Sequence, residues 1–315
     1  MRLSLFILLT LLSILSLGIG VQSLNWNELF HLESKTWLIL LSSRFPRLVT
    51  LILSGVGLSL SGVILQHIVR NRFIEPATSG GVDAAKLGIL VSIIMIPSST
   101  AIERMGLAVS FCLLSSLLFI AIIRQIKVQN SVLIPVLGLM YGGVLSAIAE
   151  FYAYQHHIIQ SMQGWLLGDF SRIVQGRYEI IYLIVPAVIC IYFYAYRFTV
   201  LGMGENITKN LGLDYIKTTG IGLFLVAIIV ASSVITVGAI PFIGLVIPNL
   251  VVLRYGENFA KTLPIIALGG ACLLLFCDVI GRLIIYPYEV PIALTAGIIG
   301  GIVFLFLMIK RVKKR

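Results

Sequence analysis

The chain has 315 residues and a formal net charge of +10, and 59% of its residues are apolar whereas only 11% are charged. Soluble globular domains have about 25% charged residues, so this composition, with a mean hydropathy of +1.05, excludes most soluble classes as well as disordered chains, collagen and small disulfide scaffolds. The positive charge does not indicate nucleic-acid binding, because the lysines and arginines cluster between apolar runs.

Ten segments approach the roughly 20 apolar residues that a membrane-spanning helix needs. In chain order they are residues 3–22, 48–69, 84–97, 105–123, 131–153, 178–197, 218–238, 242–254, 262–280 and 290–309. The first resembles a signal peptide, but it is long enough to span and no small-residue cleavage site follows it, so we expect a retained helix. The segments at 84–97 and 242–254 are short and rich in Gly or Pro, which leaves nine or eight crossings open. We predict an all-α polytopic membrane protein of about ten helices, in which residues 1–315 form one transmembrane domain.

The distribution of basic residues predicts the orientation. With ten crossings and the N-terminus inside, the inner loops hold sixteen Lys and Arg, Lys86 among them, and the outer loops hold seven. This bias agrees with the positive-inside rule. We therefore expect both termini in the cytoplasm.

Few residues are suited to catalysis or ion coupling. Glu150 and Asp278 are expected near outer helix ends and His67 near an inner one, which gives little support to ion-coupled transport. The sequence has no HExxH, GxSxG or GxxxxGK[ST] motif, and the adjacent His156 and His157 are too few for a zinc site. We expect no metal, no cofactor and no catalytic residue. Because the chain lacks the GxxxxGK[ST] motif that binds nucleotide phosphates, ATP-driven transport would require hydrolysis by another polypeptide. A secondary transporter or channel that works alone, and an intramembrane enzyme, are the alternatives.

The loop at residues 198–217 is too polar and too short to span the membrane. Met203, Ile207 and Leu211 are spaced i, i+4 and i+8 and so share one helical face. Such a helix, parallel to the membrane, fits a groove on a partner protein. The alternative is a helix that rests on lipid, but the polar face is not rich in Lys and Arg.

Six motifs resemble those of the permease subunits of bacterial ABC importers for iron siderophores, haem and vitamin B12. They are RFPR at residues 44–47, LSGVGLSLSGVILQHIVRNRFIEPATSGG at 53–81, QGWLLGDFS at 163–171, LGMGENITKNLGL at 201–213, the stretch at 237–254, and CDVIGRLIIYPYEVPIALTAGIIGGIVF at 277–304. Two of the motifs depart from the family pattern. Arg72, Phe73 and Ile74 stand where the family usually has Pro-Leu-Ala, and Asn249 replaces a typical His.

The resemblance implies a type II ABC importer permease in the bacterial inner membrane that transports a ferric siderophore or a related metal chelate. The implied partners are two ABC ATPase subunits, a periplasmic or lipoprotein substrate-binding protein, a second permease subunit, and membrane lipid, with no nucleic acid. The second subunit is either the same chain or a paralogue. By resemblance, the fifth, eighth and tenth helices line the pathway, and the identity of the chelate is open.

The resemblance also assigns three groups of residues. ATPase coupling within residues 198–217 is assigned to Met203, Gly204, Glu205, Ile207, Lys209, Asn210, Leu211 and Gly212. Docking of the binding protein is assigned to Arg44, Arg47 and Arg282, for which anchoring of helix ends is the alternative. The cytoplasmic gate region is assigned to Asn71, Glu75 and Pro76.

Overall fold

The computed structural model describes residues 2–20, 35–126 and 133–312. Within these ranges the chain is helical, apart from loops and one isolated bridge between Leu167 and Ala239. The helices are α1 (Arg2–Gly18), α2 (Lys35–Ile39), α3 (Phe45–Val69), α4 (Gly81–Met95), α5 (Ala101–Ile126), α6 (Leu133–Gln155), α7 (Ile159–Leu166), α8 (Ile184–Leu201), α9 (Glu205–Asn210), α10 (Tyr215–Val237), α11 (Ile243–Tyr255), α12 (Phe259–Leu283) and α13 (Ile292–Val312). The all-α class is confirmed.

Each of the ten predicted spans overlaps with one of these helices. The two short spans, 84–97 and 242–254, form α4 and α11. Among the described residues, six helical stretches are long and apolar enough to cross a membrane, and α1, α11 and the part of α13 up to Leu307 are shorter apolar helices. Residues 21–22 and 131–132 of the predicted spans lie outside the described residues.

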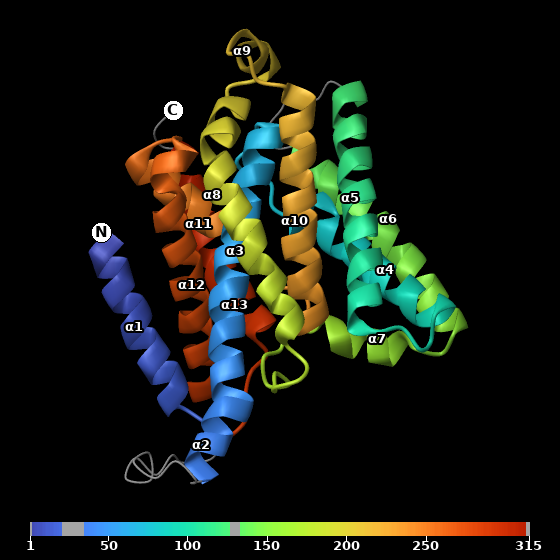
Figure 1. Cartoon of the computed structure of the whole chain (residues 1–315), viewed down its shortest axis with the longest axis vertical. Helices are drawn as coiled ribbons and strands as arrows, with labels where there is room; N and C mark the ends of the chain where they lie inside the picture. Colours follow the sequence, from blue (N-terminus) through green and yellow to red (C-terminus); the bar gives the residue numbers. More distant parts are fainter. Residues whose placement is uncertain (1, 21–34, 127–132, 313–315) are drawn as a thin grey trace.

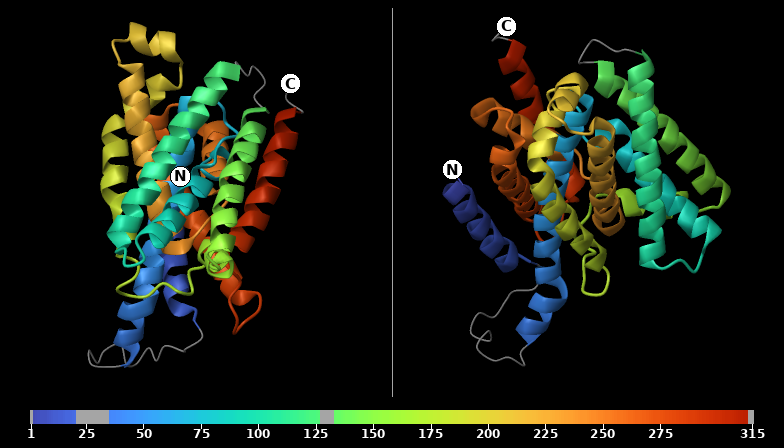
Figure 2. Two further views of the ribbon diagram at one scale, coloured as in Figure 1. Left: turned by 90° about the vertical axis from the view of Figure 1, so that its right-hand side faces the viewer. Right: turned by 45° about the horizontal axis from the view of Figure 1, so that its top comes forward.

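The short helices α2, α7 and α9 mark the two ends of the bundle. α9 projects at one end, whereas α2 and α7 lie at the opposite end (Figure 1). Following the predicted orientation, we refer to the α9 end as the inner end and to the α2 and α7 end as the outer end. Both orientations in Figure 2 show α13 rising towards the inner end.

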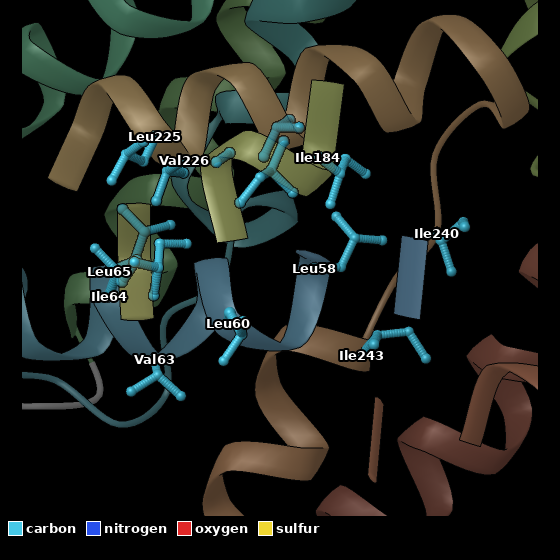
Figure 3. Close-up of a cluster of buried hydrophobic side chains, with 14 of the residues drawn as sticks. Leu58, Leu60, Val63, Ile64, Leu65, Ile184, Leu225, Val226, Ile240 and Ile243 are labelled. Atoms are coloured by element: carbon cyan, nitrogen blue, oxygen red, sulfur yellow. The ribbon is translucent and has the colours of Figure 1, made fainter. Parts of the chain in front are cut away.

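α3 is the central helix of the bundle. It contacts α8, α10, α11 and α12, and most of its residues from Leu48 to Ile68 are buried. Its apolar side chains, among them Leu58, Ile64 and Leu65, face Ile184 of α8 and Val226 of α10 (Figure 3). Four helices of the second half of the chain therefore pack around one buried helix, α3.

Glycine lets α3 approach α11 to backbone contact. A β-carbon on Gly62 would lie 1.9 Å from the carbonyl oxygen of Gly244, a distance that no repacking of side chains can relieve. Small residues at helix crossings allow this separation, and membrane helices use them for packing.

The Gly62→Ala substitution should therefore destabilise the protein, because the added methyl group meets backbone and α3 must move away from α11. Overpacking of this kind costs about 1–3 kcal/mol of unfolding free energy. Thermal unfolding is measured in detergent, with size-exclusion chromatography of heated samples as the readout. Gly220→Ala in α10 is the matched control, because nothing lies within 4 Å of its β-carbon position; equal melting temperatures for the two variants would contradict the prediction.

Lys86 is expected in an inner loop, and this is wrong. The chain after α3 folds back into the bundle, so that Gly80 packs on Tyr141 and Gly142 in the middle of α6 and α4 begins there. Lys86 lies in the second turn of α4 and is buried. Its ammonium group donates to Ser146 Oγ at 2.9 Å and to Glu150 Oε1 at 3.3 Å.

Candidate functional site

The predicted coupling residues form a compact hairpin at the inner end, the coupling hairpin, which comprises residues 202–214. α8 continues to Leu201 because Phe198, Val200 and Leu201 are buried, so the hairpin is shorter than the predicted segment 198–217. Gly204 has φ 111° and Gly212 has φ 75°, and glycine adopts such backbone angles at little cost. The two glycines thus fix both turns around α9.

The apolar residues of the coupling hairpin are exposed as the spacing predicts. Met203 is 55% exposed, Ile207 46% and Leu211 58%. Thr208, on the opposite side of α9, is buried and donates to the carbonyl oxygens of Val200 and Gly204 at 3.2 and 2.7 Å. This pins α9 to the end of α8 and leaves its apolar side outward.

The polar residues of α9 lie beside this apolar side. Lys209 Nζ is 2.8 Å from Glu205 Oε1. The hydrogen bond from Lys209, together with its charge, lowers the pKa of Glu205 below its ordinary value. Asn210 is also exposed. The hairpin therefore offers a partner an apolar centre with polar groups at its edge.

The coupling hairpin rests directly on the inner end of α3. The His67 ring lies under Gly202, where an added β-carbon would come within 2.4 Å of the ring, and its ring centroid is 5.8 Å from that of Phe259. Arg70 ends α3 in a left-handed conformation, with its guanidinium group beside Gly204. Gly202 and Gly204, which directly precede α9, are therefore in contact with the inner end of α3.

The predicted gate residues lie in the loop that follows α3, residues 71–80, which we call the gate segment. Asn71 is buried, and its Oδ1 accepts from the Phe73 amide at 2.8 Å. Pro76 accepts through its carbonyl oxygen from the Gly81 amide at 3.1 Å, which closes the turn into α4. The gate segment is thus an ordered turn within the bundle.

Glu75 joins the gate segment to α11. The side chain is 3% exposed, and its Oε1 accepts from the Phe242 amide at 3.0 Å. Because free amides at a helix N-terminus favour a negative charge, Glu75 caps α11 from a distant part of the chain.

Two further side chains tie the gate segment to α11, and sequence reasoning assigned neither of them a role. Gln66 donates from Nε2 to the Ile74 carbonyl at 3.3 Å and to the Gly244 carbonyl at 3.2 Å. Asn249 donates from Nδ2 to the Arg72 carbonyl at 2.8 Å. The sequence does contain a signal for each of these two residues. Gln66 lies within the stretch 53–81 that resembles a family motif, and Asn249 is one of the departures from the family pattern.

The three predicted docking arginines lie together at the outer end, with two carboxylates: Arg44, Arg47, Asp278, Arg282 and Glu289 form an outer ion cluster. Arg47 Nη2 is 2.7 Å from Asp278 Oδ1, and Arg47 Nη1 is 2.7 Å from Glu289 Oε2. Arg282 also pairs with Asp278.

Arg44 and Arg282 fasten α1 to the bundle. Arg44 donates to the carbonyl oxygens of Leu17 and Gly18, and Arg282 donates to those of Ser16 and Ile19. Both arginines are buried, at 8% and 4% exposed, and cations suit the C-terminal end of a helix. These contacts fit the anchoring of helix ends, while docking of a binding protein stays a prediction.

The chain and its fold are similar to those of known transport proteins. The model of a family described as the FecCD transport family matches residues 8–310. The ferric-anguibactin transport system permease protein FatD of Vibrio anguillarum is 59% identical over 95% of both chains. The petrobactin import system permease protein YclN of Bacillus subtilis is 45% identical over 98% of this chain and 97% of its own. A solved structure of a metal-chelate type ABC transporter in an inward-facing conformation has a TM-score of 0.81 and 25% sequence identity, and covers 98% of both chains.

Proposed function

The chain belongs to the FecCD transport family and is a multi-pass membrane permease, and we propose that it imports a ferric siderophore as the permease subunit of an ATP-driven importer. The cargo follows from relatives that are permeases for ferric anguibactin and petrobactin. The proposed location is the bacterial inner membrane with both termini in the cytoplasm. ATP hydrolysis takes place in two separate ATPase subunits, and a second permease subunit, either the same chain or a paralogue, completes the pathway.

The observation that supports this function best is the coupling hairpin. Three apolar side chains, Met203, Ile207 and Leu211, are exposed together at the inner end, on and beside the short helix α9, which Thr208 holds against α8. An amphipathic helix presented in this way fits a hydrophobic groove on a partner. A secondary carrier that works alone would have no use for such a rigid, exposed apolar hairpin.

The contacts support a route by which movement of the ATPase subunits reaches the pathway. Closure of the ATPase dimer on ATP moves α9, and the contact of Gly202 with His67 passes this movement to α3. α3 leads into the gate segment, which Glu75, Gln66 and Asn249 tie to α11. In this mechanism α3, the gate segment and α11 move as one body, and the pathway alternates between two packings of rigid helices.

The outer end receives cargo from a binding protein in the same proposal. Arg47 is the arginine of the outer ion cluster that is partly exposed and, in the described part of the chain, makes no hydrogen bond to α1: its side chain is 14% exposed and pairs with the carboxylates of Asp278 and Glu289. A glutamate on the binding protein competes with Glu289 for Arg47, whereas Arg44 and Arg282 hold the face in place.

Reconstitution tests the proposed function. The permease, with an ATPase and a binding protein from the same organism, is placed in proteoliposomes, and uptake of a radiolabelled ferric siderophore is measured. Uptake should require ATP, and vesicles that lack the ATPase should show none. If vesicles that contain only the permease take up as much siderophore as the complete system, the proposed function is wrong and the protein is a secondary carrier.

A further inference from the structure

A second polar region lies at the outer end, apart from the outer ion cluster and from the gate segment. There a cavity of about 260 Å³ is lined by α4, α7, α10, the start of α5 and the loop that follows α7. These elements meet at the end of the bundle opposite α9 (Figure 1). The residues that line it belong neither to the coupling hairpin nor to the gate segment nor to the outer ion cluster.

Positive charge dominates the cavity. Its ionisable lining consists of four cations, Lys86, Arg104, Arg172 and Arg177, and one carboxylate, Asp169. This excess of positive charge does not come from exposed loops alone, because Lys86 belongs to α4 and is buried in the bundle.

Internal partners neutralise only part of this charge. Lys86 pairs with Glu150 at 3.3 Å, and Arg172 Nε lies 3.9 Å from Asp169. Arg104 bonds to the Ser99 hydroxyl at 3.1 Å, which supplies no charge. Throughout the ranges that the structure describes, no carboxylate pairs with Arg104 or Arg177. A concave site with an excess of one charge and low-dielectric walls concentrates ions of the opposite charge.

The remaining walls indicate what kind of anion fits. Trp165 lines one side, and Ile89, Ile93 and Val234 supply apolar surface. Guanidinium groups bind pairs of oxygens in carboxylates and similar planar anions, and an aromatic wall favours a ring. The volume is slightly below the range of about 300–1,000 Å³ that is usual for a drug-sized ligand, so the cavity takes one arm of a larger molecule.

We propose that this cavity is a receiving site for an anionic ferric chelate whose iron is bound by oxygen donors on aromatic rings, as in a catecholate. The inference rests on the proposed import function and deepens it, since it gives the permease its own contact with the cargo at the outer end. Arg104 and Arg177 bind the anionic oxygens, and Trp165 packs against the ring.

Fluorescence of Trp165 gives a direct test on the permease alone. Replacing Trp26 and Trp37 with phenylalanine leaves Trp165 as the single tryptophan of the chain. The protein is placed in phosphatidylcholine nanodiscs and titrated with the anionic iron(III) tris-complex of 2,3-dihydroxybenzoate. Saturable quenching is expected, and the neutral iron(III) complex of acetohydroxamate should quench much more weakly.

Charge variants assign the site. The double variant Arg104→Gln, Arg177→Gln should bind the anionic complex at least about tenfold more weakly, because charge-assisted hydrogen bonds are lost. Its matched control is Lys217→Gln, Arg254→Gln, which removes the same charge from exposed positions at the inner ends of α10 and α11. The control should bind as the parent does. Equal affinity of the double variant and the parent, or equal quenching by the neutral complex, would overturn the proposal.

Anionic lipid in the nanodiscs distinguishes a chelate site from a lipid site. If phosphatidylglycerol abolishes the quenching, the cavity binds a lipid headgroup and the chelate assignment is wrong; undiminished quenching supports it. The titration needs no ATPase, so it is independent of the uptake measurement. Loss of ATP-driven uptake with intact quenching would therefore reject the proposed function alone, and intact uptake without quenching would reject only the receiving site.

Discussion

The Ile207→Asp substitution should abolish copurification of the permease with its ATPase and reduce ATP-driven uptake to background. Ile207 is at the centre of the exposed apolar side of α9, between Met203 and Leu211. A carboxylate in an apolar groove, with no partner there, costs several kcal/mol, and about 3 kcal/mol already lowers an affinity by roughly 10²-fold. Because Ile207 is exposed in the permease itself, the variant should fold and insert normally.

A matched substitution controls for the added charge. Ile216, in the first turn of α10, is 73% exposed at the same end but lies outside the coupling hairpin. Ile216→Asp should keep the complex and most of the uptake. Copurification in detergent and uptake in proteoliposomes are measured for both variants. If the Ile207→Asp variant still forms the complex, the coupling hairpin is not part of the ATPase interface.

The Asp278→Asn substitution should cause the largest loss of stability. Asp278 is 3% exposed and binds two arginines, Arg47 and Arg282. Without its charge, the buried guanidinium group of Arg282 keeps only neutral partners on α1. Breaking a buried ion pair from one side costs about 3–5 kcal/mol. Thermal unfolding in detergent should show a melting temperature well below that of the parent.

Two further variants show that the effect comes from the buried charge. Asp278→Asn combined with Arg282→Met removes both partners and should recover part of the lost stability, since replacing a buried pair by an apolar group is often close to neutral. Glu205→Gln breaks the exposed pair with Lys209 and should leave the melting temperature unchanged. A single variant as stable as the parent would mean that the outer ion cluster does not hold α1.

Sequence reasoning located the helices well because hydropathy and helix length are local properties. The ten spans, the short α4 and α11 included, follow from runs of apolar residues and are present in the structure. Lys86 was misplaced because a hydropathy window cannot register that the chain folds back after Arg70. Only the packing of Gly80 on α6 makes the start of α4 an interior position.

The site was predicted in part. The exposed apolar side of α9 follows from the spacing of three residues and could be derived without a fold. The hydrogen bond from the Phe242 amide, at the start of α11, to Glu75 and that from Asn249 to Arg72 join residues more than 160 positions apart, and no local pattern encodes such pairs. The arginines were found by resemblance, but their burial depends on where α1 ends, which the sequence does not reveal.

The outer ion cluster also constrains how the protein is made. Arg44 and Arg47 leave the ribosome more than 230 residues before Asp278 and Arg282. Until α12 has been inserted, Arg47 lacks the carboxylate of Asp278. At that stage α1 can be held by Arg44 but not yet by Arg282. Final attachment of the first helix therefore has to follow the insertion of α12, and a chain truncated before α12 leaves Arg47 without Asp278 at the outer end.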